Sequence, residues 1–194
     1  MILRVSGTAL AEQAINGGYV GIPYEILDCQ GFVEEVLKDC GVRKPNGTPY
    51  NWKGSNSMYR NYIRWRGTKE ECIKKFGCIP KGAFLFIVKH DGGEVERGYH
   101  DDLGNASHVG LYTGLDSEKE CMDSQGNRGV DFCKLKIFTH VGLMDMVDYE
   151  NDPEPKPDDE AVKAVGTLRN PGSTDKECLE ALRLLTKYLK EDTI

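Results

Sequence analysis

The sequence predicts an α+β fold in which helices come first and the strands of a small antiparallel sheet follow. Two helical patterns occupy residues 8–16 and 28–40. Short apolar runs typical of buried strands come later, at 83–88 and 107–114. Helices and strands that are segregated along a chain, instead of alternating, favour an α+β arrangement over a parallel sheet.

The composition is that of a soluble protein with one main domain. The chain has 194 residues, of which 39% are hydrophobic and 29% are charged, and this is enough to bury a core. The net charge of −6 argues against a general attraction to nucleic acid. No apolar run reaches the roughly 20 residues of a membrane span. Glu12 and Gln13 interrupt the apolar start, so we expect no secretory signal and synthesis in the cytoplasm.

The first helix is predicted over residues 8–16. Thr8 is a residue type that caps helices, and Gly17 is a type that ends them. A loop that contains Gly and Pro, residues 17–27, then leads to the next helix.

The second helix is predicted to begin with a cysteine. Asp28 is a good N-cap, and Gly41 is a natural stop. The residues of its apolar face are Phe32, Val33, Val36 and Leu37. Cys29 therefore lies in the first turn, where the helix dipole and the free backbone N–H groups favour the nucleophilic thiolate.

Turns and short helices are predicted between this helix and the first strand. Residues 41–57 are polar and turn-rich, and the run at 58–66 is interpreted as a short helix. Thr68 and Glu71 have the spacing of a capping box, so a further short helix is expected to end at Gly77.

The later part of the chain reads as strands. The runs at 83–88 and 107–114 are expected to pair antiparallel, on either side of a long polar excursion at 89–106. Further strands are predicted at 120–124 and 132–138.

The C-terminal part is predicted to be an appendage. Residues 1–150 form the main domain, 151–173 are an acidic, Pro-rich linker, and 174–190 are an amphipathic helix that starts with a capping box at Thr174 and Glu177. We expect its apolar face to dock on the main domain, to form a dimer seam or to begin a further module. That face consists of Leu179, Leu182, Leu185, Tyr188 and Leu189.

The seven cysteines do not form a recognisable metal or disulfide pattern. They are Cys29, Cys40, Cys72, Cys78, Cys121, Cys133 and Cys178. No Cys-x-x-Cys pair occurs, and the odd number argues against a fully paired set of disulfides. Most of them are expected to be small core residues.

One of the four histidines is a candidate general base. His90 and His100 lie in the polar excursion and are expected to be exposed, while His140 follows a predicted strand and is expected to be partly buried. His108 opens a predicted strand, and from that position it can face Cys29 at the start of a packed helix.

Four ordered segments resemble a known family. They are DCQGFV (28–33), PKGAFLFI (80–87), SHVGLYTG (107–114) and CMDSQGNRGV (121–130). In this order they resemble the NlpC (p-sixty) family of papain-like cell-wall cysteine peptidases, and the resemblance covers roughly residues 8–150. It implies a papain-like fold in which the nucleophile helix packs on a small antiparallel sheet.

The resemblance implies a catalytic group of three residues. Cys29 matches the nucleophile and His108 the general base. Counting back from the Arg-Gly-Val run at 128–130 puts Asp123 at the place of the third residue, which is usually histidine in the family. Gln125 is the alternative, because one extra residue in the turn would shift the count.

Further residues are assigned by the same resemblance. Tyr19 resembles the tyrosine near the oxyanion site, with Tyr24 as the weaker candidate, although both could be ordinary loop aromatics. Asp28 matches the acid that binds the free amine of the stem peptide, although helix capping alone also explains it. Gln30 replaces the usual serine, and its amide can still form hydrogen bonds with a substrate.

The function that the resemblance implies is hydrolysis of an amide bond in the peptidoglycan stem peptide, between D-γ-glutamate and the diamino acid. No cofactor or metal is needed. Without a signal peptide, the expected protein is a phage or prophage lysin, or an enzyme that reaches the wall by a non-Sec route. The alternatives are an N-acetylmuramoyl-L-alanine amidase, a catalytically silent wall-binding module, and an intracellular acyltransferase or deamidase.

Overall fold

The computed structural model describes residues 4–44, 47–93, 98–116, 118–150, 167–168 and 174–191. Two compact units divide the chain, one spanning Ile2–Asp152 and the other containing Pro153–Ile194. The predicted linker at 151–173 lies outside the described residues except for 167–168.

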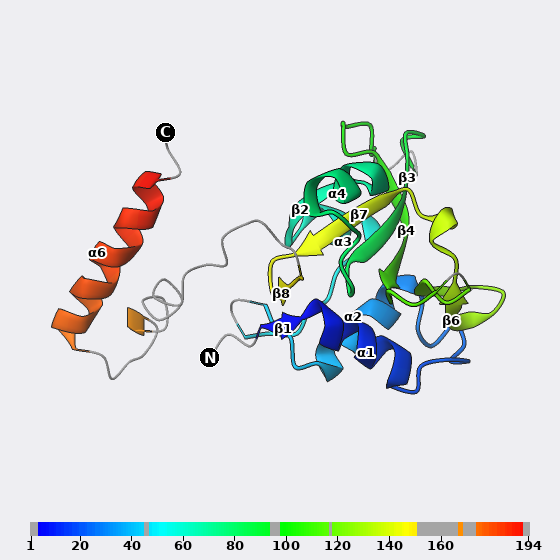
Figure 1. Cartoon of the computed structure of the whole chain (residues 1–194), viewed down its shortest axis with the longest axis horizontal. Helices are drawn as coiled ribbons and strands as arrows, with labels where there is room; N and C mark the ends of the chain where they lie inside the picture. Colours follow the sequence, from blue (N-terminus) through cyan, green and yellow to red (C-terminus); the bar gives the residue numbers. More distant parts are fainter. Residues whose placement is uncertain are drawn as a thin grey trace. The chain divides into compact units, whose positions relative to one another are not determined.

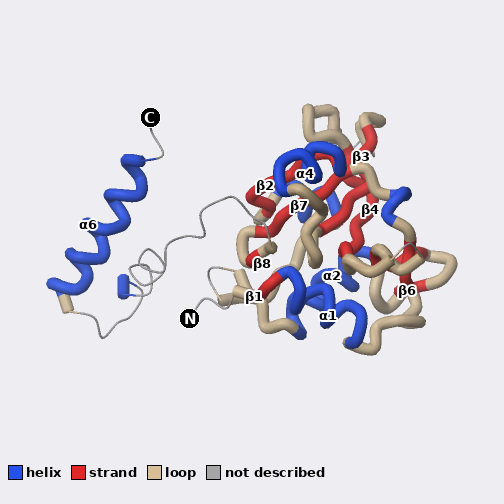
Figure 2. The backbone as a smooth tube through the Cα atoms, in the orientation of Figure 1, coloured by secondary structure: helices blue, strands red, loops and turns tan. Residues whose placement is uncertain are grey.

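The first unit is built on a six-stranded sheet, whose strands are red in Figure 2. All neighbouring strands of this sheet are antiparallel. In spatial order the strands are β2 (Ile63–Thr68), β7 (His140–Met144), β3 (Phe84–Lys89), β4 (Asn105–Tyr112), β5 (Cys121–Gln125) and β6 (Gly129–Cys133). Two short strands, β1 (Val5–Ser6) and β8 (Val147–Asp148), pair separately and in parallel. The predicted combination of helices with an antiparallel sheet is confirmed, and so is the antiparallel pairing of the two apolar runs in β3 and β4.

Helices pack on this sheet at several places. The helices of the unit are α1 (Gly7–Asn16), α2 (Cys29–Asp39), α3 (Ser55–Arg60) and α4 (Lys69–Phe76). Helix α2 packs against β4 and β5, and α1 packs against α2, so the two lie side by side (Figure 1). Helix α4 packs against β2 and β7. Helix α2, which begins with the candidate nucleophile Cys29, therefore packs against the two strands that contain His108 and Asp123.

Two helix starts follow the predicted capping chemistry. The Asp28 side chain accepts a hydrogen bond from the Gly31 amide at 2.6 Å and caps α2. Thr68 and Glu71 form a reciprocal capping box at the start of α4. Gly77 ends α4 with a φ of 81°, a left-handed conformation that glycine adopts without steric cost.

The apolar face of α2 is part of the core. Phe32, Val33, Val36 and Leu37 are all fully buried. The Phe32 ring also packs edge-on against the Tyr19 ring, with 5.6 Å between the centroids. This burial holds the first turn of the helix against the sheet.

Replacing Phe32 with alanine is expected to lower the free energy of unfolding of this unit by about 3–5 kcal/mol, because a fully buried ring is removed and a cavity is left. Urea unfolding measures the change. The matched control is Glu35→Ala on the same helix, which removes an exposed ion pair with Lys38 and is expected to cost less than about 0.5 kcal/mol. A loss below about 1 kcal/mol in the Phe32 variant would contradict the packing described here.

Helix α1 has a different cap from the one predicted. The side chain of Ser6 accepts a hydrogen bond from the Ala9 amide at 3.1 Å, so Ser6 is the N-cap and the helix begins at Gly7. The Thr8 hydroxyl instead donates a hydrogen bond to Glu150 at 2.8 Å. Ser6 and Thr8 both have side chains of a type that caps helices. Thr8 instead contacts Glu150, which lies far away in the sequence.

The prediction of a helix over residues 58–66 is wrong in its second half. Helix α3 ends at Arg60, and Tyr62 has a φ of 66°, which breaks the chain direction before β2 begins. Residues from Ile63 onward pair with β7, with Ile63 opposite Met144. Pairing with a strand about 80 positions away overrides the local helical pattern.

The strand predicted over 132–138 is also shorter than expected. Strand β6 ends at Cys133, and a 3₁₀ turn, η1 (Leu135–Ile137), follows it. This turn delivers Phe138 to the interior, where the ring is 1% exposed.

The described part of the second unit is the helix α6 (Asp175–Glu191). Its predicted capping box is present, since the Glu177 carboxylate accepts from the Thr174 amide at 2.7 Å and the Glu177 amide donates to the Thr174 hydroxyl at 3.4 Å. Leu179 and Leu182 are about half exposed, while the side chains of the rest of the predicted apolar face lie outside the described residues. None of the helices in the described ranges has the length and apolar character needed to cross a membrane.

Candidate active site

Cys29 is placed by the start of α2 and by a contact from the sheet. It is the first helical residue and is 8% exposed. The Ser124 hydroxyl of β5 donates a hydrogen bond to the Leu27 carbonyl at 2.5 Å, which ties the residues before the helix to the sheet. The Cys29 thiol lies close enough to His108 to help raise the pKa of its imidazole. The structure therefore brings the predicted nucleophile and the predicted base together.

His108 lies at an irregularity of β4. Ile87 of β3 pairs with His108, whereas the next residue, Val88, pairs with Ala106. Ser107 is therefore an extra residue in β4, and the strand has a bulge directly before the histidine. Bulges of this kind are common beside active sites, where they redirect a side chain.

A buried aromatic ring fixes the plane of the imidazole. The Phe138 ring stacks on the His108 ring with 5.9 Å between centroids and an angle of 13°. A Cβ atom on Gly110 would lie only 2.8 Å from the Phe138 ring. Glycine at this position leaves the space that Phe138 occupies, which gives a physical reason for the His-Val-Gly sequence of this strand.

Asp123 accepts hydrogen bonds from three side chains. It is fully buried in β5, and its carboxylate accepts from His108 Nε2 at 2.8 Å, from Gln125 Nε2 at 2.9 Å and from the Arg128 guanidinium. Of the two candidates for the third residue, Asp123 contacts the imidazole, while Gln125 contacts Asp123. Because Nε2 is occupied by Asp123, Nδ1 is the ring nitrogen available to Cys29.

The charges of these groups follow from their contacts. Burial lowers the pKa of His108, but the hydrogen bonds to Asp123 and Cys29 and their negative charges outweigh it and raise that pKa to about 9. Burial acts to raise the pKa of Asp123, but hydrogen bonds from His108 and Gln125 and the charges of His108 and Arg128 lower it. At neutral pH the pair is therefore an imidazolium next to a carboxylate.

This pairing predicts a pH-dependent stability. The pKa of His108 is near 6.5 when the chain is unfolded and about 9 when it is folded. Its contribution is therefore fully present below pH 6.5 and is lost as the pH rises to about 9. We expect a loss on the order of 3 kcal/mol over that window, measured by urea unfolding. The His108→Gln variant should lack this component, and parallel pH curves for the two proteins would contradict the assignment.

The structure does not support the prediction that Tyr19 lies near the oxyanion site. Its hydroxyl donates to Asp39 at 2.6 Å and accepts from Gln13 at 3.0 Å. Asp39 ends the helix that Cys29 begins, about 15 Å away along the axis. Tyr19 therefore joins α1 to the far end of α2.

Tyr24 is the tyrosine that lies near the thiol. Burial, followed by the negative charges of Cys29 and Asp28, raises the pKa of its hydroxyl. This charge effect keeps Tyr24 as a candidate for the oxyanion site, the role that the resemblance gives first to Tyr19.

Gln30 has a structural role that uses its whole amide group. Its Nε2 donates to the Glu34 carboxylate at 2.8 Å and to the Trp52 carbonyl at 2.6 Å, and its Oε1 accepts from the Gly54 amide. In place of the predicted contact with a substrate, the Gln30 amide therefore forms hydrogen bonds that join α2 to the loop at 52–54. Asp28 caps the helix as predicted, and its carboxylate is next to Cys29 on the exposed side.

Two residues of the site were not predicted as such, Arg128 and Phe138. Arg128 was used only to count positions in the turn between β5 and β6. The turn requires glycine at position 129, because this residue has a φ of 68° and a Cβ atom there would lie 2.2 Å from the Ile22 carbonyl oxygen. The Val130 amide donates to the same oxygen at 2.9 Å, so the Arg-Gly-Val turn is shaped by the loop that precedes Cys29.

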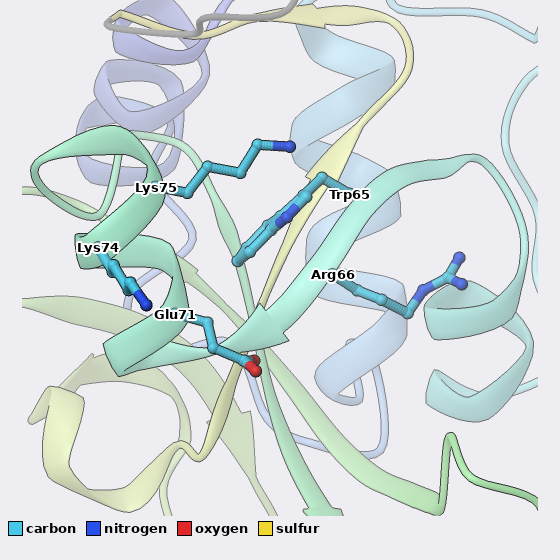
Figure 3. A pocket seen from close by; sticks show the side chains of 5 residues that line it. All are labelled: Trp65, Arg66, Glu71, Lys74 and Lys75. Carbon is cyan, nitrogen blue, oxygen red and sulfur yellow. The ribbon is translucent and has the colours of Figure 1, made fainter. Parts of the chain in front are cut away.

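A separate pocket lies between β2 and α4, away from these residues. It has a volume of about 430 Å³ and is lined by Trp65, Arg66, Glu71, Lys74 and Lys75 (Figure 3). Strand β2 is an edge of the sheet, separated from β4 by two strands. The pocket contains no nucleophile, and we do not assign the chemistry to it.

Cys29, His108 and Asp123 form the arrangement of a nucleophile, its base and the acid that orients the base. In the described ranges, no group of three or more His, Cys, Asp or Glu side chains could hold a metal ion. Comparison with protein-family models, with curated proteins and with solved structures gave no match. The arrangement itself therefore carries the functional argument.

Proposed function

We propose that this protein is a papain-like cysteine peptidase that hydrolyses an amide bond in the stem peptide of peptidoglycan. The observation that carries the proposal is the hydrogen bond of His108 to the buried Asp123, with the Cys29 thiol close enough to act on the same imidazole. The three residues come from α2, β4 and β5, and the resemblance to the NlpC family gives them the roles of nucleophile, base and third residue.

The proposed reaction starts from an ion pair in which the His108 imidazolium already holds the proton of the Cys29 thiol. The thiolate attacks the carbonyl carbon, and the Cys29 N–H at the start of α2 donates to the resulting oxyanion. Tyr24 replaces Tyr19 as the candidate for a second donor. The His108 imidazolium then protonates the leaving amine, and a thioester remains on Cys29. Water, deprotonated by His108, hydrolyses the thioester and restores the thiol.

The surroundings of Asp123 support chemistry over a silent binding role. The carboxylate is fully buried, and burial of a charge is costly unless it is paired and hydrogen-bonded. Here the pairing is directed at the imidazole, and Arg128 supplies a second positive charge. A carboxylate at this place accepts a hydrogen bond from Nε2 of His108 and so holds the histidine tautomer that a general base needs.

The position of Asp28 bears on the substrate. Its Oδ1 accepts the capping hydrogen bond from Gly31, and the residue is exposed beside the thiol. The same carboxylate can therefore cap the helix and attract the free amine of a stem peptide, as the resemblance implies. This favours cleavage between D-γ-glutamate and the diamino acid.

The test is digestion of purified peptidoglycan sacculi with the full chain, followed by mass analysis of the soluble fragments. A new N-terminus on the diamino acid is the expected result. A new N-terminus on L-alanine would make the protein an amidase with the same catalytic group. No fragments, with the His108→Ala protein as the control for contaminating hydrolases, would overturn the hydrolase proposal and leave the binding module or an intracellular acyltransferase.

A further inference from the structure

Two cysteines face each other across neighbouring strands of the sheet. Cys121 begins β5 and Cys133 ends β6, and the two residues are directly opposite in the antiparallel ladder. Opposed residues project their side chains to the same face of a sheet. All seven cysteines of the chain are free thiols in this structure.

The geometry suits a covalent bond between them. Opposed residues of an antiparallel pair have Cα atoms about 4.5–5.5 Å apart, and disulfides span about 4.4–6.8 Å between Cα atoms. The Cα separation expected for this pair therefore lies within the range that a disulfide spans. The neighbouring Cys133 thiol, followed by burial, raises the pKa of Cys121, which agrees with the opposed register of the two residues.

We propose that Cys121 and Cys133 are a disulfide site, oxidised by low-molecular-weight disulfides. Cys133 lies on the edge strand and is 9% exposed, whereas Cys121 is fully buried, so Cys133 reacts first. Its thiolate attacks one sulfur of the oxidant, forms a mixed disulfide and releases one thiol. The Cys121 thiolate then attacks the Cys133 sulfur and releases the second thiol. The protein loses two electrons and two protons, and the oxidant is reduced to two thiols.

The site has a defined place in the hairpin that carries Asp123. The ladder of β5 and β6 runs from the pair Gln125–Gly129 beside the turn to the pair Cys121–Cys133 at the open end. At the turn end of the hairpin, Arg128 forms an ion pair with Asp123. The disulfide would link the two strands at the open end of the hairpin, two residues from Asp123. It would cross-link the hairpin in its present conformation. This inference does not depend on the proposed function.

The experiment treats the native full chain with oxidised glutathione, alkylates the remaining thiols and digests the protein with trypsin without reduction. Trypsin cleaves after Lys119, Arg128 and Lys134 and so separates the two cysteines. Mass analysis is expected to find the peptide with Cys121 linked to the peptide with Cys133. The melting temperature is expected to rise by about 5–10 °C on oxidation and to return on reduction.

Single-cysteine variants provide the controls. Cys133→Ala and Cys121→Ala should each lose the linked peptide and the rise in melting temperature. Cys72→Ala removes a buried thiol of α4 that contacts the carbonyl of Cys78, and it should keep both. Recovery of the two peptides unlinked from folded wild-type protein would overturn the proposal, and so would linkage of either cysteine to another partner. Glutathione attached at Cys29 appears on a different peptide and does not affect the readout.

Discussion

Replacement of Cys29 by alanine is expected to lower the rate of peptidoglycan hydrolysis by a factor on the order of 10⁴ or more. The loss is large because the thiol is the atom that attacks, and His108 and Asp123 act only through it. Initial rates of fragment release from sacculi measure the effect. Residues that act as one unit lose activity together, so a His108→Ala change in the same background should add little.

The matched control for this variant is Cys178→Ala, which removes a partly exposed thiol from α6 and should leave the rate unchanged. Far-ultraviolet circular dichroism and the melting temperature establish that both variants are folded. A Cys29→Ala rate above about one hundredth of the wild-type rate would remove Cys29 from the nucleophilic role.

The Asp123→Asn variant is expected to lose activity by a factor on the order of 10³. An amide at this position can donate a hydrogen bond where His108 Nε2 needs an acceptor, so the imidazole is held in the wrong tautomer. The Arg128 guanidinium also loses its charged partner. The pKa of His108 should fall, because the carboxylate that raises it is gone.

The measurements are kcat/KM and its dependence on pH, with the alkaline limit of activity expected to move to lower pH. This shift distinguishes an orienting acid from a residue that merely supports the fold. Gln125→Ala, which removes one neutral hydrogen bond to the same carboxylate, should cost less than about tenfold. An Asp123→Asn protein with more than a tenth of the wild-type activity and an unmoved pH profile would contradict the assignment.

The parts of the site that depend on local chemistry could be predicted from the sequence. The start of α2 follows from the capping side chain of Asp28, whose partner is three residues away. The pairing of β3 with β4 follows from two apolar runs and a polar connection. For these elements the interactions that decide the structure lie within a short window of the chain.

The parts that depend on distant contacts could not be predicted in the same way. Tyr19 and Tyr24 lie in one loop, and the hydroxyl of Tyr19 is bonded to Gln13 and to Asp39, which are both outside that loop. Gln30 has the right neighbours for a substrate contact, but the loop at 52–54 occupies its amide. Phe138 reaches His108 only because η1 turns the chain inward.

The two ties between the nucleophile loop and the hairpin have a dynamic consequence. Ser124 of β5 donates to the Leu27 carbonyl, and Val130 of β6 donates to the Ile22 carbonyl. The residues before Cys29 and the β5–β6 hairpin that carries Asp123 are therefore joined at two points. Local opening of the edge strand would then displace the attacking thiol and the buried acid in one cooperative event. The fraction of molecules that is competent for catalysis is thus expected to follow the protection of the Val130 amide against hydrogen exchange, well below the temperature at which the whole domain unfolds.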